Sequence, residues 1–322
     1  MSLWIVGGQQ RAAFDRHRSW EGYELAVVAR VTDDGQVERV FEYRSRPAVT
    51  PERDVTQLFT ASTIAGNTIY LCAPTEIVVC TFPGFAPIRT ISLPCFNDLH
   101  HVTLGPDNTV YVAVTGLDAV AELTLEGELL RLVSTLDEVD VWQRFSPGCD
   151  YRKCATTKPH ASHPNYVFFV DGRACVTRFE QQDAIFLDDR TTVAKLPAGG
   201  HDGCAVGDDI YFTTVDGRIV RVNPARGEST SLDLNEVTRS AFPLGWCRGI
   251  LVEGSEAWVG FSRLRFSRFR KNLSWMRRGF RPSYVHHNPT RIVRFDLERR
   301  RLLCEVDLET HGINAVFSIL RG

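Results

Sequence analysis

The sequence has few of the features that mark a helical or a membrane protein. Only two of its 322 residues are methionine, and hardly any stretch repeats apolar residues at the spacing of an amphipathic helix. No window approaches the roughly 18 consecutive apolar residues of a transmembrane helix. The formal net charge of −2 provides no general attraction to nucleic acid or to an anionic surface. These absences argue against a helical bundle, a transmembrane segment and a nucleic-acid partner.

Several common motifs are also missing from the sequence. It contains no G-x-S-x-G, G-x-G-x-x-G, P-loop, H-E-x-x-H or paired C-x-x-C, so the usual hydrolase, dinucleotide, NTPase and zinc-ribbon assignments lack support. The first residues, Met1 to Gly8, form a short apolar run without a basic region or a small-residue cleavage site. They predict a strand rather than a secretory signal.

The nine cysteines favour a reducing compartment. Their number is odd, and most lie in apolar, strand-like runs (Cys72, Cys80, Cys175 and Cys304). Buried free thiols in the cytoplasm explain this pattern best. Cys149 and Cys154 have C-x₄-C spacing in a polar loop, which is not a standard zinc pair. We expect ordinary loop thiols there, with a metal or redox role as the alternative.

A repeat of short strands and turns dominates the chain. Residues 101–133 (HVTLGPDNTVYVAVTGLDAVAELTLEGELLRLV) predict four strands: 101–104, 109–115, 118–124 and 128–133. Four antiparallel strands in this length match one blade of a β-propeller. The pattern recurs in residues 57–92, 163–196, 200–232 and 246–306, and the last copy is interrupted between its second and third strands.

The two ends of the chain predict the remaining blade. Residues 311–320 resemble a first strand, and residues 2–7 begin a set of three strands that lack this partner. Pairing them removes the exposed sheet edges of a linear array. The sequence therefore predicts an all-β protein, a single-domain six-bladed β-propeller over residues 1–322, with loop insertions near 9–22, 46–56, 134–160 and 263–289. Seven blades would require strands hidden in 134–160.

Aligning the copies gives equivalent positions near the start of each innermost strand: Thr60, His101, Asn165, His201, Arg248 and Asn314. Innermost strands line the tunnel, so these side chains should converge at one mouth. Histidines converging from different blades suit Zn²⁺ or Fe²⁺ better than Ca²⁺. We expect a divalent transition metal bound by His101, His201 and one of His163 or His311. The alternatives are an anion or carbohydrate site built from the same residues, or histidines that only complete the core.

Other candidates surround this predicted site. Arg248 could clamp a carboxylate or phosphate, or form a structural salt bridge. Asp202 and Tyr151 are candidate general acids or bases, although an Asp in such a turn is often only a turn former. Thr60, Asn165 and Asn314 would contact substrate. The loop 145–165, which carries His160 and His163, predicts a partial lid over the mouth.

The segment Arg265–Arg281 is strongly basic, with interleaved aromatic residues. It predicts either a surface for an acidic partner or an Arg-rich insertion that pairs with acids elsewhere in the chain.

The stretch LHHVTLGPDNTVYVAVTGLDAVAEL resembles NHL-repeat and related six-bladed propellers, and the likeness covers most of the chain at the level of the repeat. Gluconolactonase-like and paraoxonase-like relatives use Glu, Asn and Asp around Ca²⁺, whereas His101, His201 and Arg248 stand here. The peptidyl-hydroxyglycine lyase propeller, with three histidines on Zn²⁺, is similar in ligand type. The chain also resembles uncharacterised bacterial propeller proteins, which implies no activity.

These observations favour a cytoplasmic, metal-dependent propeller enzyme. It would act on a small polar or anionic substrate at the tunnel mouth by a lyase, hydrolase or isomerase reaction. The alternative is a non-catalytic propeller that binds a protein or glycan through its loop face.

Overall fold

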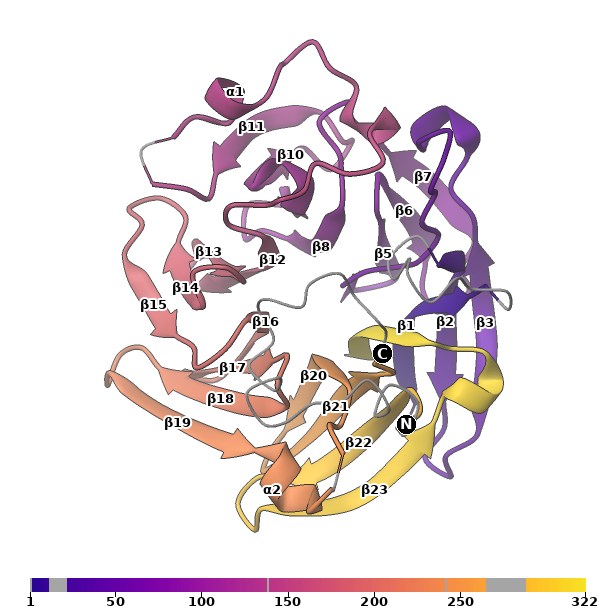
Figure 1. Ribbon diagram of the computed structural model, residues 1–322, viewed down its shortest axis with the longest axis vertical. Coiled ribbons are helices and arrows are strands. Elements are labelled where there is room, and N and C mark those ends of the chain that lie inside the picture. Colours follow the sequence, from indigo (N-terminus) through magenta and orange to yellow (C-terminus); the bar gives the residue numbers. More distant parts are fainter. Residues whose placement is uncertain (1, 12–21, 138, 241, 265–287) are drawn as a thin grey trace.

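Alternating strands and tight turns build the whole molecule. A computed structural model describes residues 2–11, 22–137, 139–240, 242–264 and 288–322. Within them the chain forms six four-stranded antiparallel sheets, arranged as blades around a central axis (Figure 1). The turns follow the sequence signals: Asp171 and Gly172 both have positive φ, 50° and 77°, as a two-residue hairpin between paired Val170 and Arg173 requires.

The first three blades, each named from its innermost strand outward, begin with the one that joins the two chain ends. Blade 1 comprises β24 (Ala315–Arg321), β1 (Leu3–Gln10), β2 (Tyr23–Val31) and β3 (Val37–Tyr43). Blade 2 comprises β4 (Thr63–Ala65), β5 (Thr68–Ala73), β6 (Glu76–Thr81) and β7 (Pro87–Ile91). Blade 3 comprises β8 (Leu99–Leu104), β9 (Val110–Val114), β10 (Ala119–Leu123) and β11 (Leu129–Ser134).

The other three blades complete the ring. Blade 4 comprises β12 (Pro164–Val170), β13 (Arg173–Arg178), β14 (Asp183–Phe186) and β15 (Thr192–Lys195). Blade 5 comprises β16 (Gly200–Val206), β17 (Asp209–Thr214), β18 (Arg218–Asn223) and β19 (Glu228–Asp233). Blade 6 comprises β20 (Trp246–Glu253), β21 (Glu256–Ser262), β22 (Arg291–Asp296) and β23 (Arg301–Asp307).

The chain ends close the ring as the sequence predicts. Strand β24 pairs antiparallel with β1 over Leu3↔Arg321 to Gly8↔Ala315. The segment between β11 and β12 holds only the short helix α1 (Val141–Arg144) and a 3₁₀ turn, Tyr151–Lys153, in its described part. No seventh blade forms there, and the six-bladed prediction is confirmed.

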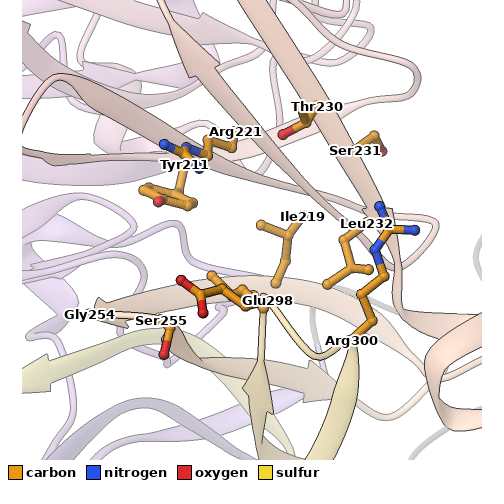
Figure 2. Close-up of a pocket in the computed structure, with 11 residues that line it drawn as sticks. Tyr211, Ile219, Arg221, Thr230, Ser231, Leu232, Gly254, Ser255, Glu298 and Arg300 are labelled. Carbon is orange, nitrogen blue, oxygen red and sulfur yellow. The ribbon is translucent and has the colours of Figure 1, made fainter.

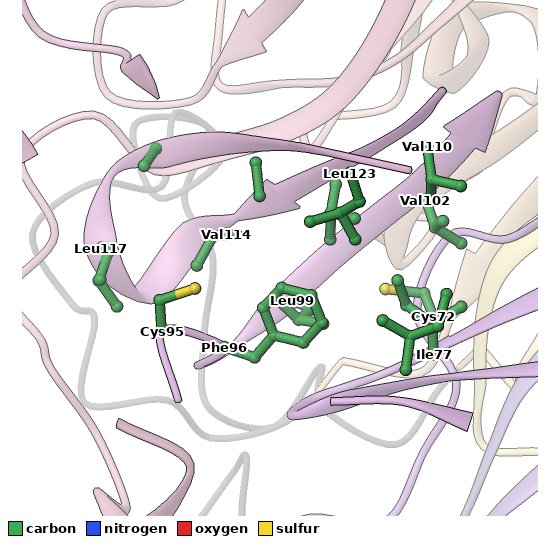
Figure 3. Close-up of a cluster of buried hydrophobic side chains, with 14 of the residues drawn as sticks. Cys72, Ile77, Cys95, Phe96, Leu99, Val102, Val110, Val114, Leu117 and Leu123 are labelled. Carbon is green, nitrogen blue, oxygen red and sulfur yellow. The ribbon is translucent and has the colours of Figure 1, made fainter. Parts of the chain in front are cut away.

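The core lies in layers between neighbouring blades. Figure 3 shows one layer, in which Cys72 and Ile77 of blade 2 meet Val102 and Val110 of blade 3. Each of these side chains is fully buried, because alternate residues of a strand face the adjacent blade. Such layers hold the inner strands at fixed positions around the axis.

All nine cysteines are free. Cys72, Cys80 and Cys175 are buried as expected, but Cys304 is exposed, because it lies on β23 at the rim of its blade. None of the helices in the described ranges has the length and apolar character needed to cross a membrane.

Candidate functional site

Four successive innermost strands have an irregular start. The pairing register shifts between Leu99 and His101 in β8, and across Asn165 in β12. It shifts again after His201 in β16 and after Arg248 in β20. A β-bulge redirects the side chains around it. At this end of four neighbouring blades, the bulges therefore change the direction of the polar side chains.

A cluster of four histidines occupies this end. The ring centroids of His100 and His163 are 5.0 Å apart, as are those of His160 and His163. The Nδ1 atoms of His160 and His163 are 3.3 Å apart, so one of them donates and the other accepts. Phe179 links the cluster to His201, with centroid distances of 5.2 Å to His163 and 5.9 Å to His201. We call His100, His160, His163 and His201 the histidine cluster.

Asp98 and Lys158 lie beside the cluster. The Nδ1 atom of His100 is 2.8 Å from the backbone carbonyl of Asp98. The Asp98 carboxylate is 3.8 Å from ring nitrogens of both His100 and His160, and 3.9 Å from the Lys158 ammonium. A carbonyl only accepts, so Nδ1 of His100 carries the proton and Nε2 is the basic nitrogen.

Burial keeps all four imidazoles neutral. It lowers the pKa of His100 to about 4, with the charge of Arg248 adding to the effect although Asp98 opposes it. Burial likewise lowers the pKa of His160, and moves the pKa of His163 and His201 well below the usual range. The charge of Arg248 also lowers the pKa of His201. Neutral imidazoles donate and accept hydrogen bonds, and the neighbouring cationic groups favour an anionic ligand, whose charge would in turn raise the pKa of the imidazoles.

Arg248 and Asp202 complete this region. The Arg248 guanidinium stacks over the Phe317 ring at 4.4 Å. The Asp202 carboxylate accepts hydrogen bonds from the hydroxyl of Thr213 and from the backbone N–H of Gly249 at 3.1 Å. Burial raises the pKa of Asp202 to about 6, so this carboxyl titrates near neutral pH, as a general acid or base requires.

The structure does not bring His101 or His311 to the cluster. The ring of His101 stacks on Tyr166 with centroids 3.6 Å apart, and its Nδ1 accepts the backbone N–H of Val167 at 3.0 Å. Burial lowers its pKa to about 3. His101 thus belongs to the layer between blades 3 and 4, and the bulge leaves its neighbour His100 at the site. His311 is exposed, on a 3₁₀ turn that follows β23.

Four other candidates have structural contacts. The Thr60 hydroxyl lies 2.9 Å from the carbonyl of Leu99, and Asn165 donates to the carbonyl of Gly200 at 2.8 Å. The side-chain carbonyl of Asn314 accepts the backbone N–H of Gln10 at 2.7 Å. The Tyr151 hydroxyl accepts the backbone N–H of Ser146 at 2.7 Å, and its ring packs against the hydrophobic core of blades 2 and 3. These contacts join strands and loops, and none places the side chain in the histidine cluster.

Comparison with known proteins identifies the architecture. No protein-family model matches the sequence, and no curated protein matches it. A protein of unknown function from Bacteroides caccae superposes with a TM-score of 0.61 at 14% identity, covering 99% of this chain and 97% of its own. A chain of a nidogen–laminin complex gives 0.59 at 11%, covering 99% and 97%. A streptogramin B lyase gives 0.52 at 12%, covering 97% and 90%. The protein is a six-bladed β-propeller.

The likeness to these propellers shows the fold alone, so the site must be judged from its own donors. Two nitrogens bound to one Zn²⁺ at about 2.0–2.1 Å in tetrahedral geometry lie about 3.3 Å apart, which is the separation of the His160 and His163 Nδ1 atoms. In the described part of the propeller, no three His, Cys, Asp or Glu side chains are arranged to hold a metal ion. Of the predicted ligands, His163 and His201 lie in the histidine cluster, whereas His101 and His311 lie elsewhere.

Sequence reasoning missed His100, Asp98 and Lys158. One signal was available: His100 and His101 are adjacent, and a bulge decides which of two neighbours faces the site. The predicted lid residues His160 and His163 do lie in the cluster. The basic segment Arg265–Arg281 lies outside the described residues.

A separate cavity lies at the opposite end of blades 5 and 6 (Figure 2). Its volume is about 220 Å³, and its walls include Tyr211, Arg221, Glu298 and Arg300. The Gly254–Ser255 turn, which also lines it, follows the far end of β20 from Arg248. Arg221 pairs with Asp209 at 2.6 Å.

Proposed function

We propose that the propeller is an enzyme that binds a small polar or anionic substrate at the histidine cluster and transfers protons to or from it. The observation that carries the proposal is the burial of four neutral imidazoles in one cluster, two of which, His100 and His201, also lie in the field of Arg248. Burying so many titratable groups costs stability, and perturbed pKa values of this kind concentrate at functional sites.

The residues suggest how the work is divided. Arg248 would bind a carboxylate or phosphate of the substrate, because a guanidinium offers paired donors. His100 would act as the base through Nε2, with its ring oriented by the carbonyl of Asp98. Asp202, with its pKa raised by burial to about 6, and Lys158 are available as proton donors. This chemistry suits an elimination, a hydrolysis or an isomerisation.

A metal-assisted form of this reaction has one specific observation in its favour. The facing Nδ1 atoms of His160 and His163 have the separation of two zinc ligands, and neutral imidazoles are suitable ligands for Zn²⁺ or Fe²⁺. These two residues would hold the ion, and a bound metal would supply Lewis-acid activation. Metal content of the purified protein, measured with and without His163→Ala, separates the two forms.

The streptogramin B lyase with the same fold supports the general idea that a six-bladed propeller can carry a lyase site. The alternative function, binding of a protein or glycan without catalysis, rests on Arg265–Arg281 and the loop face. A propeller of that kind would not need neutral histidines at its axis.

Binding of simple anions tests the proposal. We expect inorganic phosphate or succinate to bind the wild-type protein in isothermal titration calorimetry. Arg248→Gln should weaken this binding by about 10- to 100-fold, since charge-assisted hydrogen bonds contribute roughly 1.5–3 kcal/mol. Arg300→Gln, at the opposite end, is the matched control and should bind normally. Equal binding by both variants, or none by the wild type, would refute an anion site at Arg248.

Catalysis needs its own measurement. A panel of small hydroxy acids, their lactones and phosphate esters can be incubated with the protein and followed by proton NMR. Turnover of any of them should be lost in His100→Gln. Turnover that survives this substitution would exclude His100 as the base.

A further inference from the structure

One buried carboxylate receives three successive backbone N–H groups of the segment that carries His160 and His163. Oδ1 of Asp118 accepts from Ser162 and from His163, each at 2.8 Å. Oδ2 accepts from Ala161 at 2.9 Å and from the Arg144 guanidinium at 2.7 Å. Asp118 is almost fully buried. The accepting carboxylate is therefore shielded from water, although Arg144 and Ala161 reach the surface.

The backbone of this segment is shaped as an anion-binding nest. Consecutive N–H groups point to one place when a left-handed residue ends the run, and His163 has φ 57° although it is not glycine. That conformation is disfavoured for a side chain with a Cβ atom, so contacts of the nest must stabilise it. The anion in this nest is the protein's own Asp118.

Further bonds fix the other edge of the segment. The carbonyls of Ser162 and His163 accept the backbone N–H groups of Glu180 and Phe179, each at 3.1 Å. The Thr135 hydroxyl lies 2.8 Å from the Ser162 hydroxyl. Residues 161–163 are thus held between blade 4 and Asp118, which follows a 3₁₀ turn of blade 3.

We propose that Asp118 is a positioning residue for the histidine cluster: its carboxylate fills the nest and thereby sets the facing arrangement of the His160 and His163 imidazoles. The role of these imidazoles toward substrate rests on the proposed function, but their dependence on Asp118 does not. Although burial raises the pKa of Asp118, the N–H groups of Ala161 and His163 and the Arg144 guanidinium lower it overall. The carboxylate therefore stays ionised in the nest.

Imidazole ¹⁵N resonances report the arrangement directly. Protein labelled with ¹⁵N-histidine is compared with Asp118→Gly at one neutral pH, with assignments taken from His160→Gln and His163→Gln. Glycine suits position 118, whose φ is 50°, and leaves the nest open. We expect the His160 and His163 resonances to shift or broaden in Asp118→Gly. Formate, added to fill the nest, should restore them.

Asp296→Asn is the matched control. Asp296 is also buried and accepts a backbone N–H and a guanidinium, both from Arg299, at 2.8 and 3.3 Å, but it lies at the opposite end of blade 6. This variant should lose comparable thermal stability and keep the wild-type histidine resonances. Unchanged His160 and His163 resonances in folded Asp118→Gly would overturn the proposal, as would changed resonances that formate fails to restore.

Anion binding separates this proposal from the proposed function. If wild-type protein binds phosphate or succinate, Asp118→Gly should weaken that binding by about 10-fold, and formate should recover it. If the wild type binds neither anion, the proposed function fails, and the histidine resonances still decide the role of Asp118.

Discussion

The two ends of the propeller differ in how their titratable side chains are exposed to solvent. At the histidine cluster, titratable side chains are buried against one another, and burial keeps the imidazoles neutral. At the other end, the lining of the cavity of Figure 2 includes three charged side chains, and one of them, Arg221, is paired with an acid and mostly exposed. A surface ion pair costs little to form and contributes little. Buried neutral histidines cost stability, and this cost is the reason to propose function at the first end.

Acid should destabilise the protein more than any single substitution, because the buried, neutral histidines favour the unfolded state once low pH protonates them there. The pKa values of His100 and His101 are lowered to about 4 and about 3, mainly by burial. A lowered histidine pKa gives stability that is present above the ordinary value near 6.5 and is lost as pH falls below it. At pH 5 each should cost about 2 kcal/mol relative to pH 7.5.

Asp202 opposes this trend. Its pKa is raised to about 6, so the protonated carboxyl stabilises the fold by about 1 kcal/mol at pH 5. This contribution is lost as the pH rises through 6. The histidines outweigh it. Urea denaturation at pH 7.5 and 5.0 measures the combined effect of the histidines and Asp202 on the free energy of unfolding. A value that does not fall at pH 5.0 would contradict the conclusion that the histidines are buried in the neutral form. The exposed His311 provides the control, since His311→Gln should leave the drop unchanged.

The repeat explains why the fold could be predicted and the site only in part. Turn residues at regular intervals define each blade. The strands at the two chain ends lack partners within their own copies, so pairing with each other satisfies the backbone N–H and C=O groups at their edges. Side-chain direction at the site depends instead on bulges. The single extra residue of the bulge in β8 turns His100 rather than His101 toward the cluster. The hydrogen bonds of Asp118 with residues 161–163 join segments far apart in the chain, and no local sequence pattern predicts them.

The adjacent residues His100 and His101 have different environments and should respond differently to substitution. His101→Phe keeps the stacking on Tyr166 but leaves the buried N–H of Val167 without an acceptor. We expect a loss of about 1–3 kcal/mol in the free energy of unfolding at pH 7.5, with phosphate or succinate binding unchanged. His100→Gln should weaken that binding by about 10-fold or more. If His101→Phe weakened binding and His100→Gln did not, His101 would be the residue at the site.

The smallest effect is expected at the opposite end. Arg221 pairs with Asp209 at 2.6 Å, but its side chain is 56% exposed, so solvent screens the pair. Arg221→Ala should lower the free energy of unfolding by less than about 1 kcal/mol, and added salt should reduce the difference further. Calorimetry with phosphate and succinate should show wild-type affinity. If Arg221→Ala instead lost binding as Arg248→Gln is expected to, the anion would occupy the cavity of Figure 2, which Arg221 lines.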